Sequence, residues 1–221
     1  CPEYSLEPED IWAVSKRRPP MSAIPMVSFC DLPLSLIGKH LKEYGSFGVG
    51  LKKSWGTRNG VAPVIYTHSR AKTRPAVARL TNRARKHCDR AALKDLMFLA
   101  AYTKLFEGHS WRNGRVQKRK IRFYDEREWR YVPSIVGSEP MFLPFEEYED
   151  IPRRTTLHNI LKRKHSLEVT PDVIQYLVVP HDNEEKNILE LHDCLTNLYS
   201  RKDAILASTA IMTDDCIKED I

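Results

Sequence analysis

The feature that most constrains the fold is an irregular mixture of short apolar runs and longer segments with helical periodicity. Residues 26–30 and 175–179 are apolar runs of the length expected for buried strands. Within residues 34–44, by contrast, apolar side chains recur at helical spacing. The regular strand–helix–strand rhythm of a doubly wound sheet is missing. The pattern therefore predicts an α+β fold: a single mixed domain over residues 1–221, with a central, largely antiparallel sheet and flanking helices.

Other elements can be predicted from the same patterns. A core helix is expected from about residue 86 to residue 106, because Ala92, Leu96 and Leu99 fall on one face. The basic stretch that follows residue 68 is predicted to be a loop leading into this helix. A later helix is expected after Asp182 or Asn183, either of which can cap it. Further strands are predicted at residues 47–51, 63–68, 121–124, 129–132, 141–145 and 207–212.

Positive charge is concentrated in two segments. The formal net charge is +6, but residues 181–221 hold ten acidic and four basic residues, which leaves +12 for residues 1–180. Much of this charge lies in the basic segments 69–90 and 112–122. Such clusters can bind the phosphates of a nucleic acid, or they can form the solvated face of a loop or helix. No helix-turn-helix pattern is evident, which argues against sequence-specific reading of DNA.

Several signals of other protein classes are missing. No apolar stretch approaches the roughly 18–20 residues that span a bilayer, and no signal segment opens the sequence. The cysteines are scattered without a C-x-x-C pair, which argues against a zinc site or a disulfide framework. A phosphate-binding G-x-x-x-x-G-K motif and a serine–histidine–acid constellation are both missing. We expect a soluble, cytoplasmic protein with no metal site.

Three segments of the sequence carry a resemblance to a known family. They are IPMVSFCDLPLSLIGKHLKEYGSFGVGL at residues 24–51, FYDEREWRYVP at 123–133 and DVIQYLVVP at 172–180. Together they resemble the AbiGi family of abortive-infection proteins. The resemblance implies a component of a bacterial phage-defence system, on the antitoxin side of a two-gene toxin–antitoxin pair. It also implies a cognate toxin of nucleotidyltransferase type as the partner.

The chain departs from the family pattern at its start. Family members usually begin with a short strand that carries a histidine flanked by aromatic residues, before the segment that matches Cys1. We expect this strand to be missing here and the sequence to be partial. If that histidine is functional, this chain alone would be inert.

The layout is also distantly similar, at the level of fold, to ADP-ribosyltransferases. This likeness implies NAD as the cofactor and an active or degenerate transferase site. By the same analogy, Glu128 is the principal catalytic residue and Glu126 assists it. The residues assigned to cofactor binding are Ser28, Tyr44, whose ring would stack on nicotinamide, and Arg130.

The stretch from residue 126 to residue 130 can support this chemistry. In a strand, Glu126, Glu128 and Arg130 would share one face. A glutamate beside the ribose stabilises the oxocarbenium-like state that forms when the nicotinamide bond breaks. Alternatively, such residues form a ladder of ion pairs without any catalytic role. A non-enzymatic protein that binds nucleic acid or the toxin is therefore the alternative function.

Overall fold

The described residues divide into two compact units. The computed structural model describes residues 1–8, 21–112, 115–135, 137 and 139–219. Unit 1 consists of Cys1–Asp31 and Gly60–Ser166, and unit 2 consists of Leu32–Asn59 and Leu167–Ile221. Helices combine with mainly antiparallel strand pairs, which confirms the predicted α+β class. The expectation of one domain over residues 1–221 stays a prediction.

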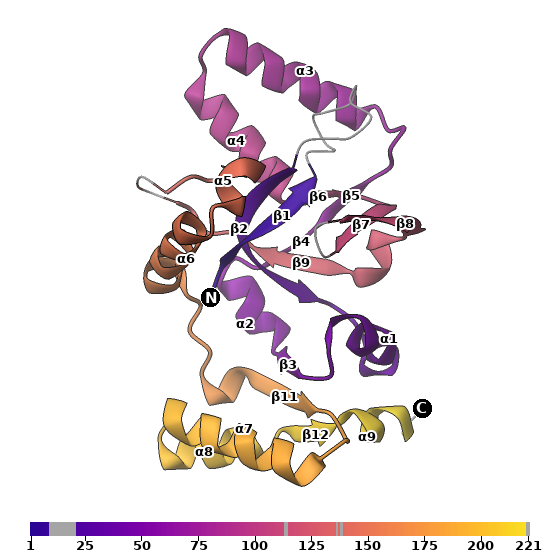
Figure 1. The fold of residues 1–221 in the computed structure, drawn as a ribbon, viewed down its shortest axis with the longest axis vertical. Helices are drawn as coiled ribbons and strands as arrows, with labels where there is room; N and C mark the ends of the chain where they lie inside the picture. The colour runs from indigo at the N-terminus through magenta and orange to yellow at the C-terminus, as the bar shows by residue number, and fades with distance from the viewer. Residues whose placement is uncertain (9–20, 113–114, 136, 138, 220–221) are drawn as a thin grey trace. The chain divides into compact units, whose positions relative to one another are not determined.

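Unit 1 is built on an antiparallel sheet around the long strand β2 (Met21–Cys30), as Figure 1 shows. The first part of β2 pairs with β1 (Glu3–Pro8), and its last part pairs with β9 (Glu128–Tyr131). Two short strands complete the sheet: β4 (Ala62–Pro63) pairs with β9, and β10 (Leu143–Pro144) pairs with β2. Because β2 is shared, it joins the N-terminal strand to the acidic stretch near residue 128.

Helices pack on this sheet through small apolar faces. α4 (Arg90–Ala101) packs against Ile24 of β2. α6 (Ile151–His165) packs against Tyr4 of β1. The short helix α5 (Phe145–Glu149) precedes α6. The other elements of unit 1 are α3 (Thr73–Lys86), the parallel pair β5 (Ile65–Thr67) and β6 (Thr103–Leu105), the antiparallel pair β7 (Gly108–Arg112) and β8 (Arg115–Ile121), and the 3-10 helix η1 (Phe123–Glu126).

Two predictions in this unit were wrong, and a third was correct in kind but too long. The basic stretch after residue 68 contains helix α3 instead of forming a loop, and the helix predicted at 86–106 is confined to α4. Cys88 separates the two helices with a left-handed φ of 53°, and Asp89 caps α4 by accepting from the backbone N–H of Ala92 at 3.0 Å. The strand predicted at 121–124 is largely the 3-10 helix η1. Of the second basic segment, residues 113 and 114 lie outside the described residues.

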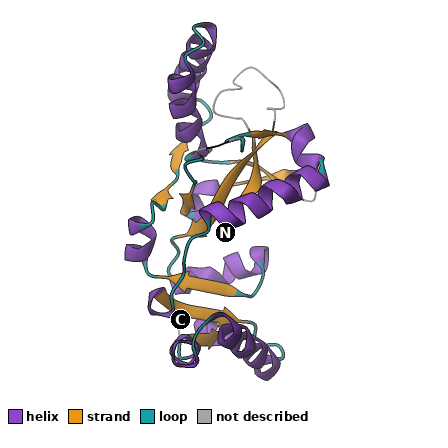
Figure 2. Ribbon diagram, turned by 90° about the vertical axis from the view of Figure 1, so that its left-hand side faces the viewer, coloured by secondary structure: helices purple, strands orange, loops and turns teal. Residues whose placement is uncertain are grey.

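Unit 2 is a small sheet with helices on both faces (Figure 2). Its middle strand, β11 (Ile174–Val179), runs parallel to β12 (Ile211–Thr213) and antiparallel to β3 (Gly48–Leu51). Leu177 packs against two of the helices, and the next residue, Val178, packs against two others on the opposite face. The helices are α1 (Leu34–Tyr44), α2 (Lys53–Arg58), η2 (Pro171–Val173), α7 (Glu184–Leu198), α8 (Arg201–Ser208) and α9 (Asp214–Glu219).

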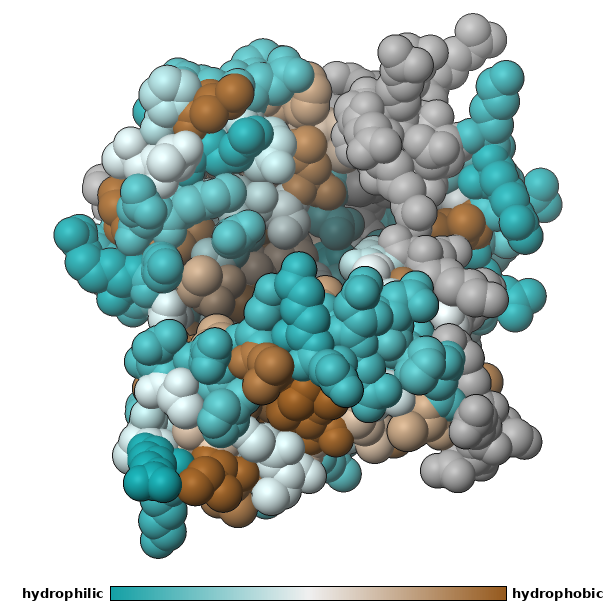
Figure 3. Space-filling view, turned by 60° about the horizontal axis from the view of Figure 1, so that its bottom comes forward, coloured by the Kyte–Doolittle hydropathy of each residue, from teal (hydrophilic) through white to brown (hydrophobic). Residues whose placement is uncertain are grey.

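Several large apolar side chains are exposed at the surface of the described residues. Figure 3 shows hydrophobic patches between hydrophilic regions on the face that it displays. In unit 2, the side chains of Phe47 and Val49 are 66% and 61% exposed. No helix in the described part of the chain is long and apolar enough to cross a membrane.

Candidate functional site

Strand β9 places two charged side chains inside unit 1. Side chains alternate along a strand, and Glu128 and Arg130 are only 6% and 0% exposed. Trp129, between them, is only partly buried. In the register of β2 with β9, Ser28 lies opposite Arg130. An unpaired charge in this position would be strongly destabilising, so both groups require partners in the interior.

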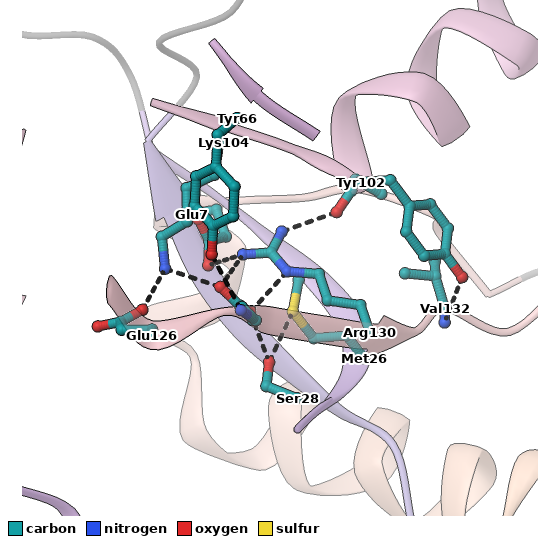
Figure 4. Close-up of polar contacts among 11 residues, drawn as sticks. Glu7, Met26, Ser28, Tyr66, Tyr102, Lys104, Glu126, Arg130 and Val132 are labelled. Carbon is teal, nitrogen blue, oxygen red and sulfur yellow. Dashed lines mark hydrogen bonds and ion pairs between the residues drawn. The ribbon is translucent and has the colours of Figure 1, made fainter. Parts of the chain in front are cut away.

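The carboxylate of Glu128 accepts four hydrogen bonds from described side chains. The three donor residues, Ser28, Lys104 and Arg130, are labelled in Figure 4. Its Oε1 accepts from Ser28 Oγ at 3.0 Å and from Arg130 Nε at 2.7 Å. Its Oε2 accepts from Lys104 Nζ at 2.9 Å and from Arg130 Nη2 at 3.2 Å. A carboxylate offers about four lone-pair sites. The acceptor capacity of Glu128 is therefore filled by side chains of the protein itself.

The guanidinium of Arg130 connects three elements of unit 1. Beyond its two bonds to Glu128, Nη1 donates to the carbonyl of Ala101 at 2.7 Å and Nη2 donates to Glu7 Oε1 at 2.8 Å. Glu7 belongs to β1, and Ala101 is the last residue of α4. Because the guanidinium is a planar fork of donors, one side chain ties β9 to β1 and to the end of α4.

Lys104, in β6, joins the two glutamates of the acidic stretch. Its Nζ lies 2.9 Å from Glu128 Oε2 and 3.3 Å from Glu126 Oε2. Glu126 lies in η1, so the strand face expected for residues 126 to 130 begins only at Glu128. Arg127 has a left-handed φ of 43° and turns the chain between η1 and β9. Both carboxylates reach the same amine across this turn.

Ion pairing outweighs burial in setting the charge of this cluster. Burial raises the pKa of Glu128, but the positive charges of Arg130 and Lys104 lower it by more than burial raises it. The net result is a pKa of about 2, below the ordinary value of 4.5. Burial lowers the pKa of Arg130 and of Lys104, yet Glu7 and Glu128 raise both above their ordinary values. The carboxylate and both cations are therefore charged at neutral pH.

The structure brings four of the five predicted site residues into one hydrogen-bonded cluster with Lys104. These four are Ser28, Glu126, Glu128 and Arg130. The fifth, Tyr44, belongs to α1 of unit 2, where its ring centroid lies 4.4 Å from that of His40. Stacking of Tyr44 on a cofactor stays a prediction, as do the catalytic roles of the glutamates.

Sequence reasoning missed three members of the cluster. Besides Lys104 and Glu7, it missed Tyr66, whose hydroxyl oxygen accepts from the backbone N–H of Glu128 at 3.0 Å. One signal was available, since Lys104 is a single charge in the otherwise uncharged run from residue 98 to residue 106. A lysine in such a run indicates a buried carboxylate partner. For Glu7 and Tyr66 the local sequence holds no comparable signal.

The cluster does not fit NAD as an ADP-ribosyltransferase site would. A catalytic glutamate must accept a hydrogen bond from a ribose hydroxyl, but the acceptor positions of Glu128 are taken by Ser28, Arg130 and Lys104. In the described ranges, no three or more His, Cys, Asp or Glu residues are grouped so that they could hold a metal ion. The arrangement is suited to holding strands together.

Comparison with known proteins places the chain in a family. The family model described as "Putative abortive phage resistance protein AbiGi, antitoxin" matches residues 6–180. An abortive phage resistance protein AbiGi from Lactococcus lactis subsp. cremoris is 30% identical over an alignment of 165 residues, and the match covers 66% of this chain and 66% of that protein. No solved structure matches. The chain belongs to the AbiGi family.

The matched segment contains the whole charge cluster. Residues 6–180 include every described member, from Glu7 to Arg130. They end just after β11, so that α7, α8, β12 and α9 of unit 2 follow the match. The alignment with the Lactococcus protein spans just under two thirds of that relative, at 66%.

Proposed function

We propose that this protein is a phage-defence component that acts by binding a toxin, as an antitoxin, and that its charge cluster holds the fold and performs no catalysis. The description of the matched family supports the antitoxin side of an abortive-infection system. Phe47 and Val49, two residues apart in the chain, are both exposed apolar side chains, which is compatible with the binding of a protein partner.

The saturated carboxylate of Glu128 carries the non-catalytic part of the proposal. To accept a bond from a substrate, Glu128 must lose Ser28, Lys104 or Arg130. Leaving a buried group without its partner costs roughly 1–3 kcal/mol, and more when the group is charged. The transition-state stabilisation gained through Glu128 would have to exceed this cost.

Co-expression with the cognate toxin that the antitoxin description implies tests the binding function. We expect the toxin alone to arrest growth and its co-expression with this protein to restore growth, with the two proteins eluting together in size-exclusion chromatography. Arrest that persists despite soluble expression of this protein would contradict the proposal.

Incubation with labelled NAD tests the alternative, an active ADP-ribosyltransferase. We expect neither transfer of label nor release of nicotinamide. Transfer that disappears in Glu128→Gln but persists in Glu107→Gln would establish catalysis by Glu128, because Glu107 is an exposed glutamate outside the cluster. The melting temperature of Glu128→Gln must be measured alongside, since loss of a buried ion pair also weakens the fold.

Nucleic-acid binding is a second candidate function, favoured by the basic face of α3. The exposed side chains of this helix include Arg79, Arg83, Arg85 and Lys86. Such a function is compatible with an antitoxin that also contacts nucleic acid. It does not depend on the charge cluster.

A further inference from the structure

Helix α3 presents a row of cations to the solvent. Arg79, Arg83 and Lys86 are spaced by four and three residues, so they lie on one face of the helix. All three side chains are exposed, and Lys72, seven residues before Arg79, extends the row at the N-cap. We call these four residues the α3 stripe. Arg79, Arg83 and Lys86 form a line of positive charge on the helix, and Lys72 lies two turns before it, beyond Pro75 and Ala76.

Packing fixes the direction in which the α3 stripe points. Thr81 and Ala84 of α3 are each 6% exposed, and they lie on the side of the helix away from Arg79 and Arg83. α3 packs against α4, which is its neighbour in Figure 1. Since the buried side of α3 is occupied, the α3 stripe faces outward.

The charge of the stripe is not neutralised by nearby carboxylates in the described part of the chain. α3 contains no acidic residue, and no ion pair joins Arg79, Arg83 or Lys86 to a described carboxylate. Asp89, the acid that follows α3, is engaged as the N-cap of α4. Cations in a last turn also favour the helix dipole. That effect accounts for Arg83 and Lys86 but not for Arg79 or Lys72.

We propose that the α3 stripe binds the phosphodiester backbone of a double-stranded nucleic acid without reading its sequence; this inference rests on the second candidate function. From Arg79 to Lys86 the helix rises about 10.5 Å. That length corresponds to roughly three phosphates of one strand, at 3.4 Å each along the duplex. Three cations thus face about three phosphates.

The composition of α3 favours a duplex over a single strand. Proteins that bind single strands stack the bases on aromatic rings, and α3 contains no Phe, Tyr or Trp. A duplex instead displays phosphates at its surface and keeps its bases stacked inside. Lysine and arginine side chains that contact phosphates position a protein but carry no sequence information.

Salt-dependent binding of the full chain to a labelled 20-base-pair duplex, followed by fluorescence anisotropy, tests the inference. One phosphate contact for each of the four cations of the α3 stripe, Lys72 included, predicts a slope of log K against log salt of about −3.6, or a loss of roughly 100-fold in affinity between 50 and 200 mM salt. The triple variant Arg79→Gln, Arg83→Gln, Lys86→Gln should lose at least ~10-fold in affinity, and its slope should flatten by about 3.

A matched variant separates the α3 stripe from net charge. Lys162→Gln, Arg163→Gln, Lys202→Gln removes the same charge from exposed residues of α6 and α8, outside both basic segments, and should keep affinity within about 3-fold. Equal losses in the two variants, or tighter binding of a single strand than of the duplex, would overturn the inference while leaving nucleic-acid binding intact. If the unaltered protein does not bind the duplex at 50 mM salt, both this inference and the nucleic-acid-binding function are contradicted. Circular dichroism of each variant verifies that α3 still folds.

Discussion

At the scale of single residues, Glu128 is the position where burial and ion pairing oppose each other most directly. Its pKa is about 2 in the folded protein, below the ordinary 4.5, so folding favours the charged form. The stabilisation is complete above pH 4.5 and is lost as the pH falls from 4.5 toward 2. We expect the free energy of unfolding, measured by urea denaturation, to decrease across that window.

The variant Glu128→Gln is the control for this pH dependence. It lacks the titrating group, so its free energy of unfolding should be lower at neutral pH and should change less between pH 4.5 and pH 2. If the free energy of unfolding changes with pH in the same way in both proteins, the acid sensitivity arises from other carboxylates.

Among the cations of the cluster, Arg130 is the one whose removal should lower the free energy of unfolding the most. Arg130→Met leaves Glu128 without two of its four described hydrogen bonds and Glu7 without its bond from Nη2. Breaking a buried ion pair from one side destabilises a protein by about 3–5 kcal/mol, which chemical denaturation can measure. Arg122→Gln is the matched control, because the Arg122 side chain is 60% exposed and should contribute less than about 1 kcal/mol. Equal effects of the two changes would contradict a fold-holding cluster.

The sequence predicts the core of the candidate site but not its full membership. The spacing of Glu128 and Arg130 follows from strand alternation alone. Lys104 and Glu7 reach them through the pairing of β1 with β2 and through the placement of β6, and these are contacts between distant parts of the chain. Sequence periodicity describes local structure only. Partners from distant segments, such as Lys104 and Glu7, can therefore be identified only once the strand order is known.

At the scale of elements, α3 shows why a helix can escape a periodicity argument. Its buried residues include Thr81 and Ala84, which are small and contribute little to an apolar pattern. The charged side chains of the helix dominate the sequence and resemble those of a solvated loop. By contrast, residues 34–44 and 175–179 carry larger apolar residues, and the structure confirms both predictions as α1 and β11.

The pairing of β3 with β11 depends on a glycine. Gly50 lies opposite Tyr176, and a Cβ at residue 50 would overlap the ring of Tyr176. Because the ring would have to move within a packed sheet, Gly50→Ala should lower the free energy of unfolding by about 1–3 kcal/mol. Gly38→Ala is the matched control in helix α1, where a Cβ meets nothing within 4 Å. It should stabilise the helix by up to ~1 kcal/mol; two changes of the same sign would contradict this account.

At the scale of the whole molecule, each unit is assembled from separate segments of the chain. Residues 32–59 contribute α1, β3 and α2 to unit 2, and residues 167–221 contribute the rest. The sequence predicted the α+β class and many of its strands, since both follow from local patterns. It did not predict the division into units, because that depends on contacts between residues more than 100 positions apart.

The end of the family match at residue 180 is therefore not the end of a folding unit. Leu177 of β11 is 4% exposed because Leu195, Ala204 and Ala207 cover it. Truncation after Pro180 would expose this face and remove β12, the parallel neighbour of β11. We expect the truncated chain to aggregate, or to lose hydrogen-exchange protection in β11 and β3. Truncation after Thr213 removes only α9 among the described elements and should cost less. A monomeric 1–180 chain that melts like the full chain would mean that unit 2 folds without α7 and α8.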